Sequence, residues 1–521
     1  MRIDELAQKS IDGLSNGEAL DHIGLLIDAS NDARSSAGTD RAFSLLDEIR
    51  KRDLPPDLAA LAHYFAANAW ENRVHQKVQH DVWAWEQPEV QAQILELRGA
   101  VRHEGFAQLH VMRQCQILTN LANQLDHIGR FIEAVEFLDR ALTLNGRFAM
   151  ALGNRGIALG AYARALHDGG HAGLMLMMAH DSLAAATSRD TLYDSDAQDA
   201  ARAAFENCRM EILERADVEE IRKTIDLDGH SLGGDTAERA YRTWCLEHRL
   251  FINPLNDLGV HAIAACDVLT LPSLTFTEPS TQVPPIIGFF NQMKQEYVSA
   301  RYLYYEGVNG DRPHYSDREV LLYNTLDYPS YSIAVEKMRT AFRIAYSLLD
   351  KIAYFLNTYL ALGHKPKQVS FRSVWYEAKG TEPRPLLQHF SACHNWPLRG
   401  LFWLSKDIFE DDFRLVTEPD AQALKDVRDH LEHKYMQLHE SWIGDAFSME
   451  DDAQSQAVQF GLHLSRDDFA ARTLRVLKFV RAALIYLSLA VHREEWQRRR
   501  GQEAGLVMPM FLDTWQDSWK Q

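Results

Sequence analysis

The chain has 521 residues, of which 46% are hydrophobic and 25% are charged. This length predicts two or three domains of roughly 100–200 residues each. Glycine (28) and proline (16) are scarce, which favours helices over a sheet-rich architecture. The net charge of −18 argues against a protein that follows nucleic acid along an extended basic face, but it leaves room for a small local cleft.

The sequence predicts a soluble, cytoplasmic protein. No run of about 18 apolar residues is present, and the longest apolar stretch, near Ala482–Val491, is too short to span a membrane. Met1–Asn31 is polar and amphipathic and lacks the basic start and apolar centre of a secretory signal. The five cysteines are far apart and form no CxxC pair, which is typical of free thiols in a reducing compartment.

A helix–turn–helix pattern lies between Cys115 and Phe148. Small residues at Ala122 and Ala134 would let two antiparallel helices approach closely, and Gly129 stands where a tight turn tolerates little side chain. On the second helix, Ala134, Leu138 and Ala141 are spaced by four and then by three residues. This spacing recurs upstream and downstream, within Ala42–Ile49 and Ala179–Ala186. This pattern resembles the tetratricopeptide repeat, a unit of about 34 residues.

The resemblance implies a repeat scaffold over residues 1–218. Such units stack into a superhelix because none can bury its apolar face alone, and the concave surface usually binds a peptide or a partner protein. The alternative is a generic helical bundle with small residues at its crossings.

The rest of the chain is predicted to hold a connector, a bundle and a tail. Residues 219–288 form the connector, with the extended or turn-like segment LFINPLND, and residues 501–521 form an aromatic-rich tail. Between them, residues 289–500 regain the helical period. Four helices are expected there, at Ile333–Leu362, Trp396–Phe409, Pro419–His439 and Phe469–Trp496. Together they predict an all-α protein that ends in an antiparallel four-helix bundle.

The candidate site lies in the third of these helices, in the segment VRDHLEHKY. Arg428 and His433 are five residues apart, so on a regular helix they would point about 140° from one another. Asp429 and His433 stack at i and i+4, where the carboxylate could orient the imidazole or raise its pKa. Arg428 could approach a phosphate from a helix end, or two copies of the motif could face each other across a dimer axis.

The motif consists of an arginine, a polar residue, three further residues and a histidine. In the third helix of a four-helix bundle, this pattern resembles the motif of the HEPN superfamily (higher eukaryotes and prokaryotes nucleotide-binding). The segments LFINPLNDLG, FNQMKQEYVSARYLYYEG, LLDKIAYFLNTYL, VSFRSVW and RGLFWLSKDIF are similar to a bacterial branch with N-terminal repeat arrays. The resemblance implies a metal-independent endoribonuclease without a cofactor, which dimerises so that paired motifs form one cleft. It also implies a role in phage defence or in RNA-targeting toxicity, regulated through the array.

The residue types suit this chemistry. RNA carries its own nucleophile, the 2′-hydroxyl, so an enzyme needs a base for that proton and a cation for the phosphorane charge. His433 is the natural base or acid because an unperturbed imidazole titrates near neutrality, and Arg428 offers planar donors to phosphate oxygens. The expected products carry a 2′,3′-cyclic phosphate and a 5′-hydroxyl.

Neighbouring residues have two interpretations each. His430 and Glu432 either line the cleft or are merely exposed helix residues. Tyr435 either stacks a base or packs in the core. Asp350 and Lys351, on the first long helix, either support the Arg428 helix or form a plain ion pair or solvated face.

Two rival functions stay open. The first is metal binding by the nearby set His430, Glu432, His433, His439 and Glu440, although no HExxH or CxxC pattern accompanies these residues. The second is a non-catalytic scaffold or adaptor that only dimerises and binds protein or nucleotide, which the acidic net charge favours.

Overall fold

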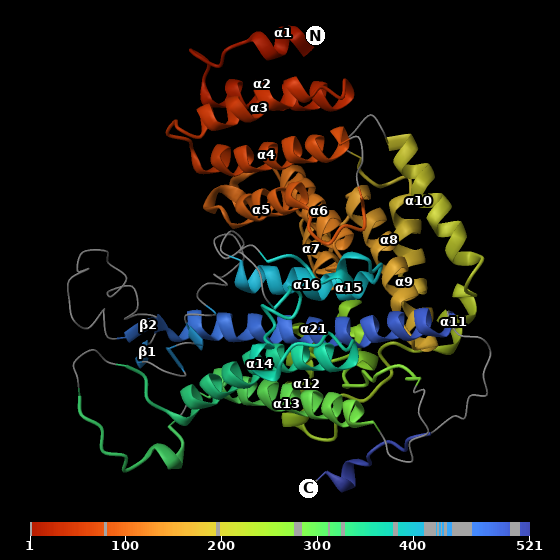
Figure 1. The fold of residues 1–521 in the computed structure, drawn as a ribbon, viewed down its shortest axis with the longest axis vertical. Coiled ribbons are helices and arrows are strands. Elements are labelled where there is room, and N and C mark those ends of the chain that lie inside the picture. Colours follow the sequence, from red (N-terminus) through yellow and green to blue (C-terminus); the bar gives the residue numbers. More distant parts are fainter. Residues whose placement is uncertain are drawn as a thin grey trace.

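The computed structural model describes residues 3–77, 81–193, 198–275, 284–310, 313–324, 329–378, 384–410, 424, 427–428, 430–431, 435–439, 461–500 and 511–520. Most of these residues are helical, which confirms the predicted all-α class. Figure 1 shows a stack of N-terminal helices at one end of the molecule and the C-terminal helices at the other. No helix in this part of the chain is long and apolar enough to cross a membrane.

The N-terminal stack is built from helical hairpins. Its helices are α1 (Ile3–Gln8), α2 (Asn16–Asp32), α3 (Ser36–Ile49), α4 (Pro56–Gln76), α5 (Pro88–Arg102), η1 (Glu104–Gln108), α6 (Val111–His127), α7 (Phe131–Leu144), α8 (Ala149–Ala165), α9 (Gly169–Ala186) and α10 (Gln198–Leu213). Helices α2 and α3, α4 and α5, α6 and α7, and α8 and α9 pack as consecutive pairs. This arrangement confirms the predicted helical repeats, while their tetratricopeptide type stays a prediction.

Residues 214–275 contain short elements between the stack and the C-terminal helices. They are α11 (Val218–Thr224), α12 (Thr236–Glu247), η2 (Pro254–Asp257) and η3 (Ala262–Ala264). The segment LFINPLND is non-helical up to η2, as predicted, and it is buried throughout.

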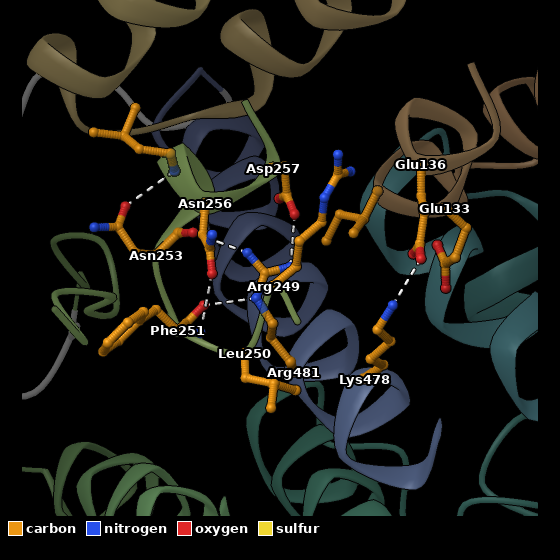
Figure 2. A network of polar contacts seen from close by, with 12 residues as sticks. Glu133, Glu136, Arg249, Leu250, Phe251, Asn253, Asn256, Asp257, Lys478 and Arg481 are labelled. Atoms are coloured by element: carbon orange, nitrogen blue, oxygen red, sulfur yellow. Dashed lines mark hydrogen bonds and ion pairs between the residues drawn. The ribbon is translucent and has the colours of Figure 1, made fainter. Parts of the chain in front are cut away.

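This buried segment takes part in a network of polar contacts with Arg481 (Figure 2). Arg481, from a C-terminal helix, donates to the Asp257 carboxylate at 2.6 Å and to the carbonyl oxygens of Phe251 and Asn253 at 2.6 and 2.9 Å. The hydroxyl of Tyr162, in α8, donates to the other Asp257 oxygen at 3.0 Å. The segment therefore contacts the array as well as the C-terminal helices, rather than packing only onto the following domain.

The C-terminal part consists mainly of long helices. Its elements are α13 (Pro285–Val308), η4 (Tyr315–Asp317), α14 (Ile333–Tyr359), η5 (Pro366–Gln368), α15 (Gln388–Ser391), α16 (Trp396–Phe409), β1 (Tyr435–His439), β2 (Gly461–Ser465), α21 (Arg466–Arg500) and η6 (Asp517–Trp519). Helices α14, α16 and α21 occupy the predicted helical segments. Helix α21 runs across the middle of the molecule, with α13 and α14 on one side and α16 on the other (Figure 1).

The predicted helix Pro419–His439 is wrong at its C-terminal end. Tyr435–His439 is strand β1, which pairs in parallel with β2, and His439 also forms an antiparallel bridge with Pro329. The Ser330 amide donates to the Leu438 carbonyl at 2.6 Å. Pairing with two distant segments outweighs the local helical pattern of this stretch because strand formation depends on the surrounding structure.

Helix α16 attaches the array to the C-terminal helices through buried charges. The Asp407 carboxylate accepts two hydrogen bonds from Arg98 in α5, at 2.7 and 2.9 Å, and one from Arg130 at 2.6 Å. Asp407 is 1% exposed and Arg130 is 1% exposed. Burial alone would raise the pKa of the Asp407 carboxyl, but the two guanidinium groups hold that pKa at about 2.

Two glycines bring the backbones together beside this ion pair. A Cβ on Gly129 would lie 2.3 Å from the Trp396 carbonyl oxygen, and a Cβ on Gly400 would lie 2.2 Å from the Gly129 carbonyl oxygen. Gly129 also adopts φ +91°, where a side chain is strained. The predicted turn is therefore correct, and it serves in addition as the contact between the array and α16.

Candidate functional site

The described part of the motif segment is a helical stretch with one buried face. Leu424, Val427 and Leu431 are buried, whereas Arg428 and His430 are half-buried. Apolar residues at i, i+3 and i+7 lie on one side of a helix. Arg428, four residues after Leu424, and His430 lie at the two edges of this face, where both are half-buried. Asp429, Glu432 and His433 lie outside the described residues, and the predicted pairing of Asp429 with His433 stays a prediction.

Helix α14 contacts this segment. The Arg428 guanidinium carbon lies 5.9 Å from the ring centre of Tyr346, within the range of a cation–π contact. One turn earlier on α14, Arg343 donates to the Leu431 carbonyl oxygen. A further turn back, Arg339 donates to the Met436 carbonyl oxygen at 2.9 Å. Three residues at i, i+4 and i+7 on one face of α14 thus contact the motif segment.

Of the two interpretations of Asp350 and Lys351, support of the Arg428 helix is not among the contacts of these residues in the described part of the chain. Asp350 accepts a hydrogen bond from the Phe371 amide at 2.9 Å, and Lys351 forms an ion pair with Glu296 of α13 at 2.5 Å. For Lys351 the plain ion pair is confirmed. The supporting residues are Arg339 and Arg343, which lie farther toward the N-terminus of α14.

A sequence signal for these two arginines exists. Arg339 and Arg343 are four residues apart within a helix whose other face is a continuous apolar stripe. Residues at i and i+4 share one side of a helix, so the pair marks a polar side opposite the apolar stripe. The partner atoms are main-chain carbonyl oxygens, however, and no sequence pattern identifies those.

Tyr435 begins strand β1 and is 39% exposed, so it does not pack in the core. Its hydroxyl accepts a hydrogen bond from the Gln437 side-chain amide at 2.6 Å. An exposed aromatic ring on the strand that follows the motif is a surface on which a nucleobase could stack.

His439 belongs to the sheet rather than to a group with His430. Its Nε2 lies 3.1 Å from Nδ1 of His463 on β2, and the two rings are 14° from parallel. Among the described residues, no three His, Cys, Asp or Glu side chains gather in a way that could hold a metal ion. His433, Glu432 and Glu440, the other members of the rival metal set, lie outside the described residues.

The arrangement combines a cation with a fixed backbone. The planar guanidinium of an arginine can bind two oxygens of one phosphate group. The backbone on the C-terminal side of Arg428 is hydrogen-bonded to α14 at Leu431 and again at Met436. Such a scaffold suits a site that must hold a phosphodiester in a defined orientation.

A family model described as LA2681-like HEPN matches residues 277–494. The C-terminal part of the chain is a HEPN domain. The match covers α13, α14, α16 and most of α21 and includes the whole VRDHLEH motif. Neither a curated protein nor a solved structure matches the chain.

The HEPN match confirms the resemblance seen in the sequence. The matched region also includes Arg339, Arg343 and Tyr346, so the α14 face and the segment it contacts lie in the same domain. HEPN domains are generally associated with ribonucleases, which makes RNA chemistry the first function to consider for the motif.

Proposed function

We propose that the HEPN domain is a metal-independent endoribonuclease. The observation that carries the proposal is the position of the motif: it lies inside the matched region, and Arg428 is half-buried at the edge of the apolar face of its helical stretch, against the ring of Tyr346. In this proposal Arg428 and His433 are the catalytic residues and Asp429 orients His433.

The proposed reaction uses the 2′-hydroxyl of the substrate. His433 removes its proton, the 2′-oxygen attacks the adjacent phosphorus, and the bond from phosphorus to the 5′-oxygen breaks. Arg428 stabilises the charge that develops on the phosphoryl oxygens. The leaving 5′-oxygen takes up a proton, so the products are a 2′,3′-cyclic phosphate and a 5′-hydroxyl. Water, metal and cofactor take no part in this step.

The substrate is RNA, and the working form is a dimer or a larger even oligomer. HEPN domains commonly bind RNA and dimerise, and two copies of the motif would form one composite cleft. His430 and Glu432 would line this cleft. Tyr435 would stack a base, which its exposure on β1 supports.

The repeat array would regulate the nuclease. Its contact with α16 through Arg98, Arg130 and Asp407 supports this role, because a change in the array would be transmitted to the HEPN domain through a buried interface. A protein or peptide bound in a tetratricopeptide-like groove would supply the signal. Restraint of this kind suits an enzyme of phage defence or of a toxin system.

A second candidate function is a dimerising scaffold or adaptor that binds protein or nucleotide. The net charge of −18 favours it, because long-range attraction of RNA is weak for an acidic protein.

The test is cleavage of tRNA and mRNA by the full chain in EDTA, with the ends of the products mapped. Arg428→Ala and His433→Ala should each lower the rate by at least about 100-fold, the range seen when one transition-state donor is removed. Arg318→Ala is the matched control, since Arg318 is exposed and lies outside the motif. Gel filtration checks that the variants keep the oligomeric state of the wild type.

Cleavage that survives EDTA and leaves cyclic phosphate ends supports the proposal. Strict dependence on a divalent ion, or equal activity in the motif variants and the control, overturns it. A wild-type protein that leaves RNA intact but forms the same oligomer favours the scaffold.

A further inference from the structure

Helix α14 contacts the motif segment at three points in reverse order along the chain. Arg339, Arg343 and Tyr346 follow one another on α14, while their partners Met436, Leu431 and Arg428 run in the opposite direction. One rigid helical face therefore fixes both the guanidinium of the motif and the backbone that follows it. The residues of a functional site are positioned most precisely when the side chains that support them lie on a regular helix or strand.

The two arginines bind main-chain atoms rather than side chains. Arg343 donates to the Leu431 carbonyl, and Arg339 uses one nitrogen for the Met436 carbonyl and another for Glu336 at 2.6 Å. Hydrogen bonds from a charged donor are stronger than those between neutral groups. Both arginines are partly buried, and the Arg339 side chain is 15% exposed, so water competes little for these donors.

We propose that Arg339 and Arg343 are positioning residues of the candidate site. By anchoring the backbone at Leu431 and Met436, they fix the direction in which the motif meets its substrate. This inference rests on the proposed ribonuclease function. The rival role, direct binding of substrate phosphate by the same arginines, is disfavoured because one terminal nitrogen of each arginine already donates to a carbonyl oxygen of the segment.

The two roles differ in kinetics. A positioning residue acts on the geometry of the reacting groups, and a displacement of about 1 Å can lower the rate about 100-fold. Its loss should lower kcat and leave KM nearly unchanged. Loss of a phosphate contact made equally in the ground state and the transition state would raise KM and leave kcat unchanged.

The experiment compares Arg343→Met, Arg343→Lys and Lys351→Met in the full chain. Lys351 is the matched control because it lies on the same helix but pairs with Glu296 of α13, away from the motif. Hydrogen–deuterium exchange of peptides covering residues 427–439 reports the backbone anchor without any need for activity. Steady-state cleavage of tRNA gives kcat and KM.

Arg343→Met should speed exchange in these peptides and lower kcat about 10- to 100-fold, with KM within twofold of the wild type. Arg343→Lys keeps one charged donor and should restore part of kcat. Lys351→Met should change neither quantity.

Unchanged exchange in Arg343→Met, or faster exchange with normal kcat, overturns the positioning role, and a raised KM with normal kcat assigns Arg343 to substrate binding instead. If the wild type cleaves no RNA, the ribonuclease function and the positioning role both fail. The exchange data would still show whether α14 anchors the backbone.

Discussion

Arginines in two regions of the molecule serve two different purposes. Where α16 meets the array, Arg98 and Arg130 bind the carboxylate of one buried residue, Asp407. Where α14 meets the motif segment, Arg339 and Arg343 bind carbonyl oxygens. The first arrangement neutralises buried charge by specific side chains, whereas the second holds a backbone and places no demand on the side chains of the segment.

This difference predicts which residues affect the stability of the fold and which affect the proposed activity. Removing one partner of a buried ion pair leaves an uncompensated charge, which costs about 3–5 kcal/mol. A half-buried side chain such as Arg428 has no comparable role in the core, so its replacement should cost far less. We therefore expect variants of the array interface to affect folding and variants of the motif to affect chemistry.

The largest effect is expected from Asp407→Asn. The amide cannot neutralise Arg98 and Arg130, and the free energy of unfolding should fall by about 3–5 kcal/mol. Urea denaturation measures this loss, and limited proteolysis shows whether the array separates from the HEPN domain. Asp517→Asn is the control, since the pair of Asp517 with Lys520 is 94% and 57% exposed and such pairs contribute about 0–1 kcal/mol.

The same carboxylate makes the stability of the folded protein depend on pH in the acid range. Its pKa is about 2 in the folded protein, below the usual value of 3.8, because Arg130 and Arg98 outweigh the effect of burial. A depressed pKa contributes stability above the unfolded value, and that contribution is lost as the pH falls from about 4 to 2. Equal loss of stability in Asp407→Asn and Asp517→Asn at neutral pH would contradict the importance of this ion pair.

The sequence predicts the regular elements better than the contacts between them. The apolar stripe of α14 is a local signal, and this helix begins at Ile333 as predicted and ends at Tyr359, three residues before the predicted Leu362. Strand β1 is different, because it depends on β2 and on Pro329, and neither is near it in the sequence. A helical pattern in Tyr435–His439 carries no information about these partners.

The same limit applies to the buried charges and to the site. Asp407 lies in an apolar helix, and its partners Arg130 and Arg98 are 277 and 309 residues away. The motif revealed Arg428 because HEPN proteins share its spacing. Arg343 stayed hidden because its partner is a carbonyl oxygen, a group that every residue carries.

A smaller effect is expected from Gly400→Ala. The added Cβ would lie 2.2 Å from the Gly129 carbonyl oxygen, and a backbone atom cannot move aside as a flexible side chain can. The free energy of unfolding should fall by about 1–3 kcal/mol. Gly288→Ala in α13 is the matched control, because no atom lies within 4 Å of the new Cβ and the change should stabilise the helix by about 0.5–1 kcal/mol. A similar gain in Gly400→Ala would show that the array and α16 are not in close contact in solution.

A gain in stability, rather than a loss, is expected from Asp126→Asn, at a buried carboxyl beside this interface. Asp126 Oδ1 is buried without a hydrogen bond in the described part of the chain, although the Asp126 carbonyl accepts from the Trp396 indole at 2.8 Å. Burial raises the pKa of this carboxyl to about 7, and Arg164 only partly offsets the effect.

A carboxyl whose pKa is raised by burial destabilises the folded state once it loses its proton. Stability should therefore decline as the pH rises from about 4 to 7, and the full cost should be present above pH 7. Asp126→Asn removes the charge and keeps the shape, so its Tm should exceed that of the wild type by a few degrees at pH 8 and equal it at pH 4. Asp513→Asn, at an exposed position, should show no such difference. A Tm gain of the same size at both pH values would mean that packing, rather than ionisation, sets the cost of Asp126.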